Sequence, residues 1–165
     1  MSDIHWDLPD PHFIDLEVLP DDIDEYGHAN NSVYLRWLDA IAWAHADAVG
    51  AGREAHLSER RGMANRRTEL QFVAPCFEGD QVRVGNWIVF CDGRLRATRR
   101  FQIARVGDGA TLLRAVTHYV CIDIDSGRPK RMPETYASNY KLEPTVGAAL
   151  VHEKWPFALT REGRG

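Results

Sequence analysis

Residues Ser32–Val49 read SVYLRWLDAIAWAHADAV, and their apolar positions recur at steps of three and four. This spacing is typical of an amphipathic α-helix with one buried side. The polar residues 30–32 can cap its first turn, and Gly50 or Gly52 suits its left-handed end. The expected buried stripe comprises Val33, Tyr34, Trp37, Leu38, Ile41, Ala44, His45, Ala48 and Val49, while Arg36, Asp39 and Asp47 lie off it.

Extended segments flank this helix on both sides. Residues His12–Leu19 alternate in polarity, as a half-buried strand does. Four more segments follow the helix, and turn signals such as Asp92-Gly93 separate them; they are Ala64–Val73, Gln81–Phe90, Arg94–Val106 and Thr111–Asp125. One long helix cannot cover both faces of a parallel sheet. We therefore expect an α+β fold in which an antiparallel sheet of about five strands wraps around one central helix.

Length and composition narrow the class of protein. The 165 residues fit a single domain, and a formal charge of -4 gives no basic surface for nucleic acid. Three widely spaced cysteines predict neither a disulfide framework nor a zinc site, and they fit a reducing compartment. No apolar run approaches the ~20 residues that cross a bilayer. We expect a cytoplasmic protein without membrane insertion, metal or cofactor.

The two ends differ from the middle of the chain. Residues 1–11 are acidic and contain Pro9 and Pro11, unlike a signal peptide. The last residues, 153–165, are polar. We expect an N-terminal extension over 1–11, one domain over 12–140 and a C-terminal tail over 141–165.

A single sheet of this kind leaves an edge and a face uncovered. Pairing with a second copy of the chain is a common way to cover them. We therefore expect a homo-oligomer; the alternative is a monomer whose tail covers the edge.

Residues Asp22–Tyr34, DIDEYGHANNSVY, place carboxylates, a histidine and two asparagines just before the helix. A helix start offers unpaired N–H groups and a partial positive charge, which can stabilise an oxyanion. A carboxylate such as Asp24 beside it could attack a thioester carbonyl or activate water. The alternative is that these residues form only a helix cap and an Asx turn.

Three sequence blocks resemble the 4-hydroxybenzoyl-CoA thioesterase group of hotdog-fold thioesterases, over about residues 12–136. The first is D-x-D-x-x-G-H-x-N-N-x-x-Y-L-R-W, which begins at Asp22 and ends at Trp37. The second is TELQFVAP at 68–75, followed by Gly79-Asp80, and the third spans His118–Pro133.

This resemblance implies a hotdog fold that assembles as dimers or tetramers, with the tetramer favoured. The active sites are expected at the dimer interface. Asp24 falls on the catalytic aspartate, and the backbone N–H near Asn31 falls on the oxyanion-stabilising position. His28 and Asn30 correspond to side chains that polarise or orient the reacting groups. Gly27, Tyr34 and Glu69 complete the expected substrate-binding set, although Glu69 could equally be a partner for Arg66 or Arg67.

Two basic groups are candidates for the phosphates of coenzyme A, because guanidinium forks match phosphate oxygens. One follows the Asp92-Gly93 turn and the other follows the last strand; they are Arg94, Arg96, Arg99 and Arg100, and Arg128, Lys130 and Arg131. Solvated strand faces are the alternative explanation. His45 fits a hydrogen-bonded core or interface histidine. Asp39 and Asp47 lie off the buried stripe, which disfavours the hotdog lineage that uses a helix carboxylate.

The sequence therefore predicts an acyl-CoA thioesterase that releases the free acid and CoA. Three alternatives stay open: an acyl-ACP thioesterase, a hydratase or dehydratase, and a non-catalytic acyl-CoA binder. The spacing of Asp24 and His28 counts against the hydratase motif D-x-N-P-x-H.

Overall fold

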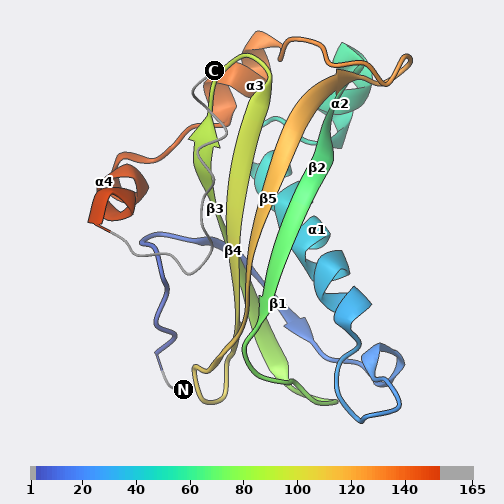
Figure 1. The fold of residues 1–165 in the computed structure, drawn as a ribbon, viewed down its shortest axis with the longest axis vertical. Coiled ribbons are helices and arrows are strands. Elements are labelled where there is room, and N and C mark those ends of the chain that lie inside the picture. The colour runs from blue at the N-terminus through green and yellow to red at the C-terminus, as the bar shows by residue number, and fades with distance from the viewer. Residues whose placement is uncertain (1–2, 153–165) are drawn as a thin grey trace.

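The structure, a computed structural model, describes residues 3–152 (Figure 1). In chain order the elements are β1 (His12–Glu17), a 3-10 turn (Pro20–Asp22), α1 (Asn31–Ala48), α2 (Arg53–Glu59), β2 (Arg61–Phe72), β3 (Gln81–Cys91), β4 (Arg96–Arg105), β5 (Thr111–Asp123), α3 (Glu134–Asn139) and α4 (Pro144–His152). The long helix and all five strands lie within a few residues of where the sequence predicts them. Helices α2, α3 and α4 were not predicted.

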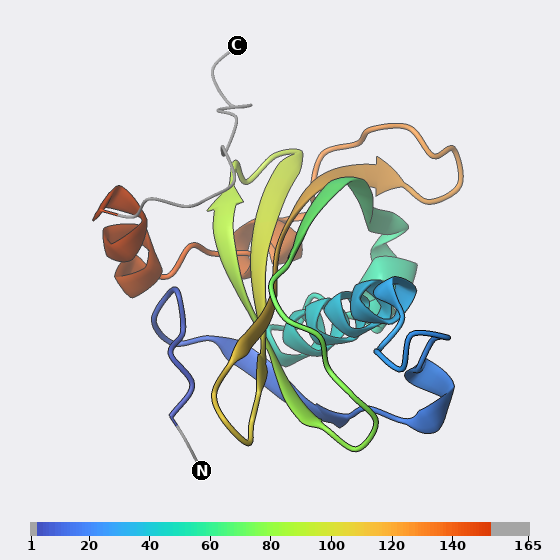
Figure 2. The same cartoon turned by 60° about the horizontal axis from the view of Figure 1, so that its bottom comes forward.

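The five strands form one antiparallel sheet in the order β1-β3-β4-β5-β2. The sheet curves strongly, and Figure 2 shows α1 lying inside the curve. A right-handed strand twist that accumulates across the sheet favours such wrapping. The expected arrangement of one sheet around one central helix is confirmed.

In its first half, helix α1 buries the apolar side that the sequence predicts. Val33, Tyr34, Trp37, Leu38 and Ile41 are buried in the main core, together with residues of β3, β4 and β5. Beyond Ile41 the buried side turns toward Ala46, whereas the predicted Ala48 is exposed. The reason is that α2 also contacts α1 and so covers a different flank of its second half.

The start of α1 is capped by Asn30. Its Oδ1 accepts hydrogen bonds from the Ser32 N–H at 2.9 Å and from the Ser32 hydroxyl at 2.8 Å. We expect Asn30→Ala to lower the free energy of unfolding by about 1 kcal/mol, because one N–H of the first turn loses its acceptor. Chemical denaturation measures this loss. Asn31→Ala is the matched control, and an equal loss there would show that the cap is not Asn30.

The N-terminal segment and α4 pack on the outer face of the sheet. Leu8 is buried with Trp87, Val89 and Val146, and the ring of Trp6 meets Trp87 edge-on at 5.8 Å. Polar contacts continue this cover, since Gln102 of β4 accepts from the Asp7 N–H and donates to the His5 carbonyl. The described parts of the predicted extension and tail thus contribute to the packed structure. The predicted polar stretch 153–165 lies outside the described residues.

No helix within residues 3–152 is both long and apolar enough to span a membrane.

Candidate active site

The loop before α1 is a tight chain reversal. Ile23 and Ala29 form an isolated antiparallel bridge, and the Asp24 N–H donates to the His28 carbonyl at 2.8 Å. The Gly27 N–H donates to the Asp24 carbonyl at 3.0 Å. Gly27 has φ +76°, a conformation that side chains strain, so a glycine is required at this turn. The loop is fixed by its own backbone and delivers the chain into α1.

The Asp24 carboxylate lies at the wall of an open hollow that Ile23, Glu25, Tyr26 and Asn30 also line. Its Oδ1 accepts the Tyr26 N–H at 2.8 Å, which is an Asx turn. Its Oδ2 has no hydrogen-bond partner among residues 3–152. The carboxylate is therefore oriented through one oxygen, and the other is available for chemistry.

The first turn of α1 has an N–H without an acceptor. Asn30 takes the Ser32 N–H, and the Asn30 carbonyl takes the Val33 N–H at 2.9 Å. Within the described part of the chain no acceptor takes the N–H of Asn31. A free N–H at the positive end of a long helix can bind a carbonyl oxygen that becomes negative during reaction.

The side chains of two other residues of the predicted site, His28 and Tyr34, have partners other than Asp24. His28 is exposed and contacts the Phe77 ring edge-on at 5.3 Å. Tyr34 is buried, its hydroxyl lies 3.2 Å from the Cys76 Sγ, and burial raises the pKa of Tyr34. This position suits a core residue. In the part of the chain that is described, neither side chain forms a hydrogen bond with the Asp24 carboxylate.

Glu69 lies on β2, at the opposite edge of the sheet from β1. It pairs with Arg67 at 2.5 Å, which is the alternative that the sequence left open. A role at the site formed by Asp24 would require this edge to face another protomer.

Asp22, which the sequence motif contains but to which no role was assigned, holds the loop in place. It is buried, its Oδ2 accepts the Leu19 N–H at 3.0 Å, and its Oδ1 lies 2.5 Å from Arg36. Its carbonyl accepts the Asn30 N–H. Because Asp22 bonds to the backbone of Leu19 and of Asn30, it is a positioning residue for the loop. No periodic pattern in the sequence indicates this role.

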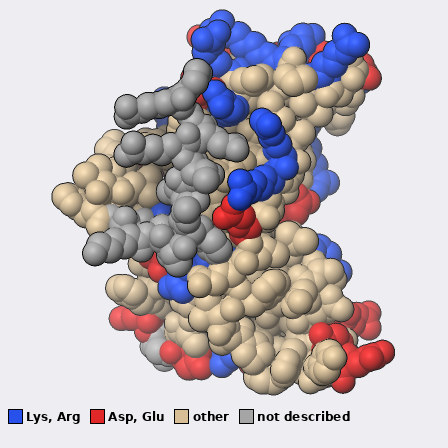
Figure 3. Space-filling model, viewed as in Figure 1, with Lys and Arg blue, Asp and Glu red and all other residues tan. Residues whose placement is uncertain are grey.

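The candidate phosphate-binding residues lie at the other end of the molecule from the loop 20–30 (Figures 1 and 2). Lys and Arg side chains gather at that end (Figure 3). Arg94 and Arg128 are exposed, Arg96 lies near Asp92, and Lys130 pairs with Asp123 at 2.9 Å. Arg99 and Arg100 are buried, so the interpretation that they lie on a solvated strand face is wrong. Both faces of β4 are covered.

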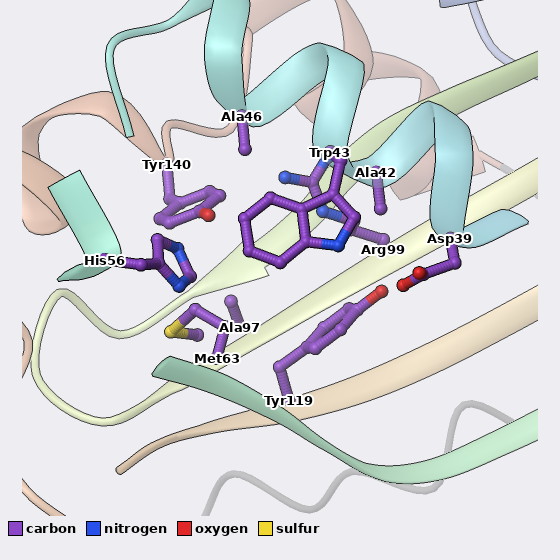
Figure 4. A pocket seen from close by; sticks show the side chains of 10 residues that line it. All are labelled: Asp39, Ala42, Trp43, Ala46, His56, Met63, Ala97, Arg99, Tyr119 and Tyr140. Carbon is purple, nitrogen blue, oxygen red and sulfur yellow. The ribbon is translucent and has the colours of Figure 1, made fainter. Parts of the chain in front are cut away.

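A cavity of about 60 Å³ lies between the second half of α1 and the sheet (Figure 4). Trp43, Tyr119 and Tyr140 give it aromatic walls, and Arg99 and His56 are polar residues in its lining. Asp39 borders it, with its carboxylate directed toward the Tyr119 hydroxyl. Although Asp39 is exposed as expected, it is a second carboxylate, after Asp24, that borders a hollow. Sequence reasoning missed this, because the cavity depends on distant segments meeting.

The Arg99 guanidinium lies in a buried polar network. Its Nη1 is 2.6 Å from the Asn86 Oδ1 and 2.7 Å from the His45 Nδ1, and His45 stacks on His12 at 4.6 Å. Burial, and next the charge of Arg99, lower the pKa of His45 to about 4. The neutral ring is the form that can accept from Arg99. The expectation of a hydrogen-bonded core histidine is confirmed.

This network predicts a pH-dependent stability. Unfolded His45 binds a proton below its ordinary pKa of 6.5, while the folded ring stays neutral down to about 4. The unfolded chain binds more protons in this window, so stability is lost as pH falls from 6.5 toward 4. We expect His45→Gln to reduce the difference in the free energy of unfolding between pH 7 and pH 5, measured by urea denaturation. An unchanged difference would show that His45 titrates normally.

No group of three or more His, Cys, Asp or Glu side chains within residues 3–152 is arranged to hold a metal ion. The chemistry available at the loop is that of a carboxylate and backbone N–H groups.

A single long helix inside a curved antiparallel sheet, with a carboxylate loop at the helix start, defines the hotdog class. The chain belongs to the thioesterase-like superfamily, whose family model matches residues 18–140. No curated protein sequence gives a match to this chain.

Solved structures share the fold at low sequence identity. A 1,4-dihydroxy-2-naphthoyl-CoA thioesterase from Synechocystis is 18% identical with a TM-score of 0.71, over 79% of this chain and 96% of that one. A gentisyl-coenzyme A thioesterase is 15% identical with a TM-score of 0.69, over 78% and 99%. A hypothetical protein from Staphylococcus aureus in complex with CoA is 14% identical with a TM-score of 0.75, over 93% and 99%.

Proposed function

We propose that this protein hydrolyses the thioester of an acyl-CoA to the free acid and CoA. The observation that carries the proposal is the Asp24 carboxylate, which is oriented through Oδ1 and has Oδ2 available in an open hollow before α1. Membership of the thioesterase-like superfamily supports the same reaction class.

The chemistry follows from the loop and the helix start. The thioester carbonyl oxygen accepts a hydrogen bond from the Asn31 N–H, and the charge that develops on it is stabilised by the positive end of α1. Asp24 either attacks the carbonyl carbon or removes a proton from the attacking water. The carbon–sulfur bond breaks and the sulfur leaves as the thiol of CoA. Water supplies the oxygen of the acid and the proton of the thiol. His28 and Asn30 orient the reacting groups, Gly27 and Glu69 contribute to substrate binding, and Tyr34 supports the site from the core beneath it.

We place the complete site between two copies of the chain, in a dimer that pairs further into a tetramer. Strand β2 lies at an edge of the sheet, and an open edge favours pairing with another chain. Glu69 and the basic residues Arg94, Arg96, Arg128 and Lys130 lie away from Asp24 within one protomer. A partner subunit can bring them to the site, where the arginines and Lys130 would bind the phosphates of CoA.

CoA is the proposed carrier because several structural neighbours act on or bind CoA compounds. A hydratase is disfavoured because, within residues 3–152, the His28 side chain contacts Phe77 and forms no hydrogen bond with the Asp24 carboxylate. An acyl-ACP thioesterase and a non-catalytic binder are separated from this proposal by experiment.

The test is a panel of acyl-CoA substrates from short to long chains, followed by the release of thiol. We expect turnover of at least one acyl-CoA, with the matching acyl-ACP hydrolysed more slowly. Binding of acyl-CoA without release of thiol would favour the non-catalytic binder. Faster turnover of acyl-ACP would contradict the choice of carrier.

A further inference from the structure

The cavity under α1 contains a buried cation that no carboxylate neutralises. Arg99 is 4% exposed, and its bonds to Asn86 and His45 are to neutral groups. Its guanidinium also lies over the Tyr140 ring, with 5.3 Å to the ring centre. Within residues 3–152 no carboxylate lies within ion-pair distance of Arg99. A buried guanidinium is costly unless its hydrogen-bonding capacity is used, so an oxygen-bearing ligand would stabilise it.

The lining of the same cavity contains a polar atom that has no partner within residues 3–152. His56 is 8% exposed, and its Nε2 has no hydrogen-bond partner among the described residues. The ring also hydrogen-bonds to the backbone of Ala51, while burial lowers its pKa and favours the neutral form. A neutral imidazole that donates to a carbonyl through one nitrogen has an acceptor at the other. Nε2 is therefore suited to a ligand O–H.

A continuous side of α1 connects the helix start to this cavity. Asn31, Leu35 and Asp39 are spaced four residues apart and so lie along one side of the helix. All three are exposed, including the apolar Leu35 at 45%, and Asp39 borders the cavity. Eight residues of helix span about 12 Å. An extended acyl chain of about ten bonds covers this distance, at roughly 1.2 Å per bond.

We propose that the cavity binds the far end of a medium-length acyl chain and that this end carries a hydroxyl group. The inference rests on the proposed function, because it takes the thioester to lie at the start of α1. The hydroxyl oxygen accepts from Arg99 and its proton is donated to the His56 Nε2, and Trp43 and Tyr119 pack against the adjoining carbon chain.

A hydroxyl group fits better than the two alternatives at this end. A methyl group would leave the buried His56 Nε2 without a hydrogen-bond partner and would offer nothing to the Arg99 guanidinium. A carboxylate would be attracted by Arg99, but it would pass the like charge of Asp39 at the cavity border and has no proton to donate to the lone pair of the His56 Nε2.

The test compares three CoA thioesters of one chain length: decanoyl, 10-hydroxydecanoyl and 9-carboxynonanoyl. We expect the kcat/KM of the hydroxylated substrate to exceed that of decanoyl-CoA by about tenfold, the effect of one added hydrogen bond to a charged group. In Arg99→Met the ratio should fall to near one. Arg83→Gln is the control, because Arg83 pairs with Asp15 on the outside of β3, and the ratio should stay at its original value. A ratio near one in the unmodified protein, or equal preference for the carboxylated substrate, would overturn the proposal.

Binding of the free acids separates this inference from the proposed function. Calorimetry of 10-hydroxydecanoate and decanoate requires no hydrolysis, and we expect the hydroxy acid to bind about tenfold more tightly. Because Arg99→Met removes a buried side chain, Ala42→Leu is a second variant that fills the cavity and keeps Arg99 in place. It should abolish the preference between the two acids. If no acyl-CoA is hydrolysed but the preference in binding is found, the proposed reaction fails while the cavity assignment stands; equal binding overturns the assignment.

Discussion

Asp24→Asn is expected to lower kcat for acyl-CoA hydrolysis by about a hundredfold to ten-thousandfold, the range for loss of a group that transfers a proton or attacks the substrate. The amide keeps the shape of the side chain and its oxygen can still accept the Tyr26 N–H, so the loop should stay folded. The measurement is thiol release under saturating substrate, with thermal unfolding to show that the variant is native.

Two other carboxylates, Glu25 in the same hollow and Asp39 at the cavity, provide controls for this prediction. Glu25→Gln changes another side chain that lines the same hollow, and its kcat should stay within a few-fold of the unmodified protein. Asp39→Asn tests the carboxylate at the cavity border. If Asp39→Asn abolishes turnover while Asp24→Asn retains it, the reaction takes place at the cavity and our assignment of Asp24 is wrong.

Ile41→Ala is expected to lower the free energy of unfolding by about 2–5 kcal/mol, because Ile41 is fully buried between α1 and the sheet. For a chain of this size the melting temperature should fall by roughly 5–15 °C. The effect is large because this side chain fixes the helix whose start supports the proposed site.

Leu57→Ala is the matched control for Ile41→Ala. Leu57 is 64% exposed on α2, so its truncation removes little packing and should change stability by about 0.5 kcal/mol or less. A similar loss in both variants would mean that α1 is not held by the burial of Ile41.

The sequence predicts the parts of the fold that periodicity determines. The apolar stripe from Val33 to Ile41 marks the helix and its buried side, and the turn at Asp92-Gly93 separates two strands that do pair. The asparagines before α1 predict a cap, and Asn30 forms it. These features are local, so the amino-acid pattern alone is sufficient.

Features that depend on contacts between segments far apart in the sequence were not predictable from local patterns. Helix α2 has only seven residues, which is about two turns. An apolar pattern that repeats over so few turns is too short to be recognised in the sequence. Arg99 and Arg100 look like residues of a solvated strand, but α1 covers one face of the sheet and the N-terminal segment covers part of the other. The cavity next to Asp39 forms from the helices and strands together, and no single segment signals it.

The central claim is that the thioester carbonyl lies between the Asp24 carboxylate and the first N–H groups of α1. The most direct measurement is a crystal structure with a non-hydrolysable acyl-CoA analogue. We predict that the analogue's carbonyl oxygen accepts from the Asn31 N–H and that its carbonyl carbon lies about 3–3.5 Å from an Asp24 oxygen or from a water that Asp24 binds. A carbonyl carbon bound beside Asp39, with Asp24 facing solvent away from the ligand, would contradict the account.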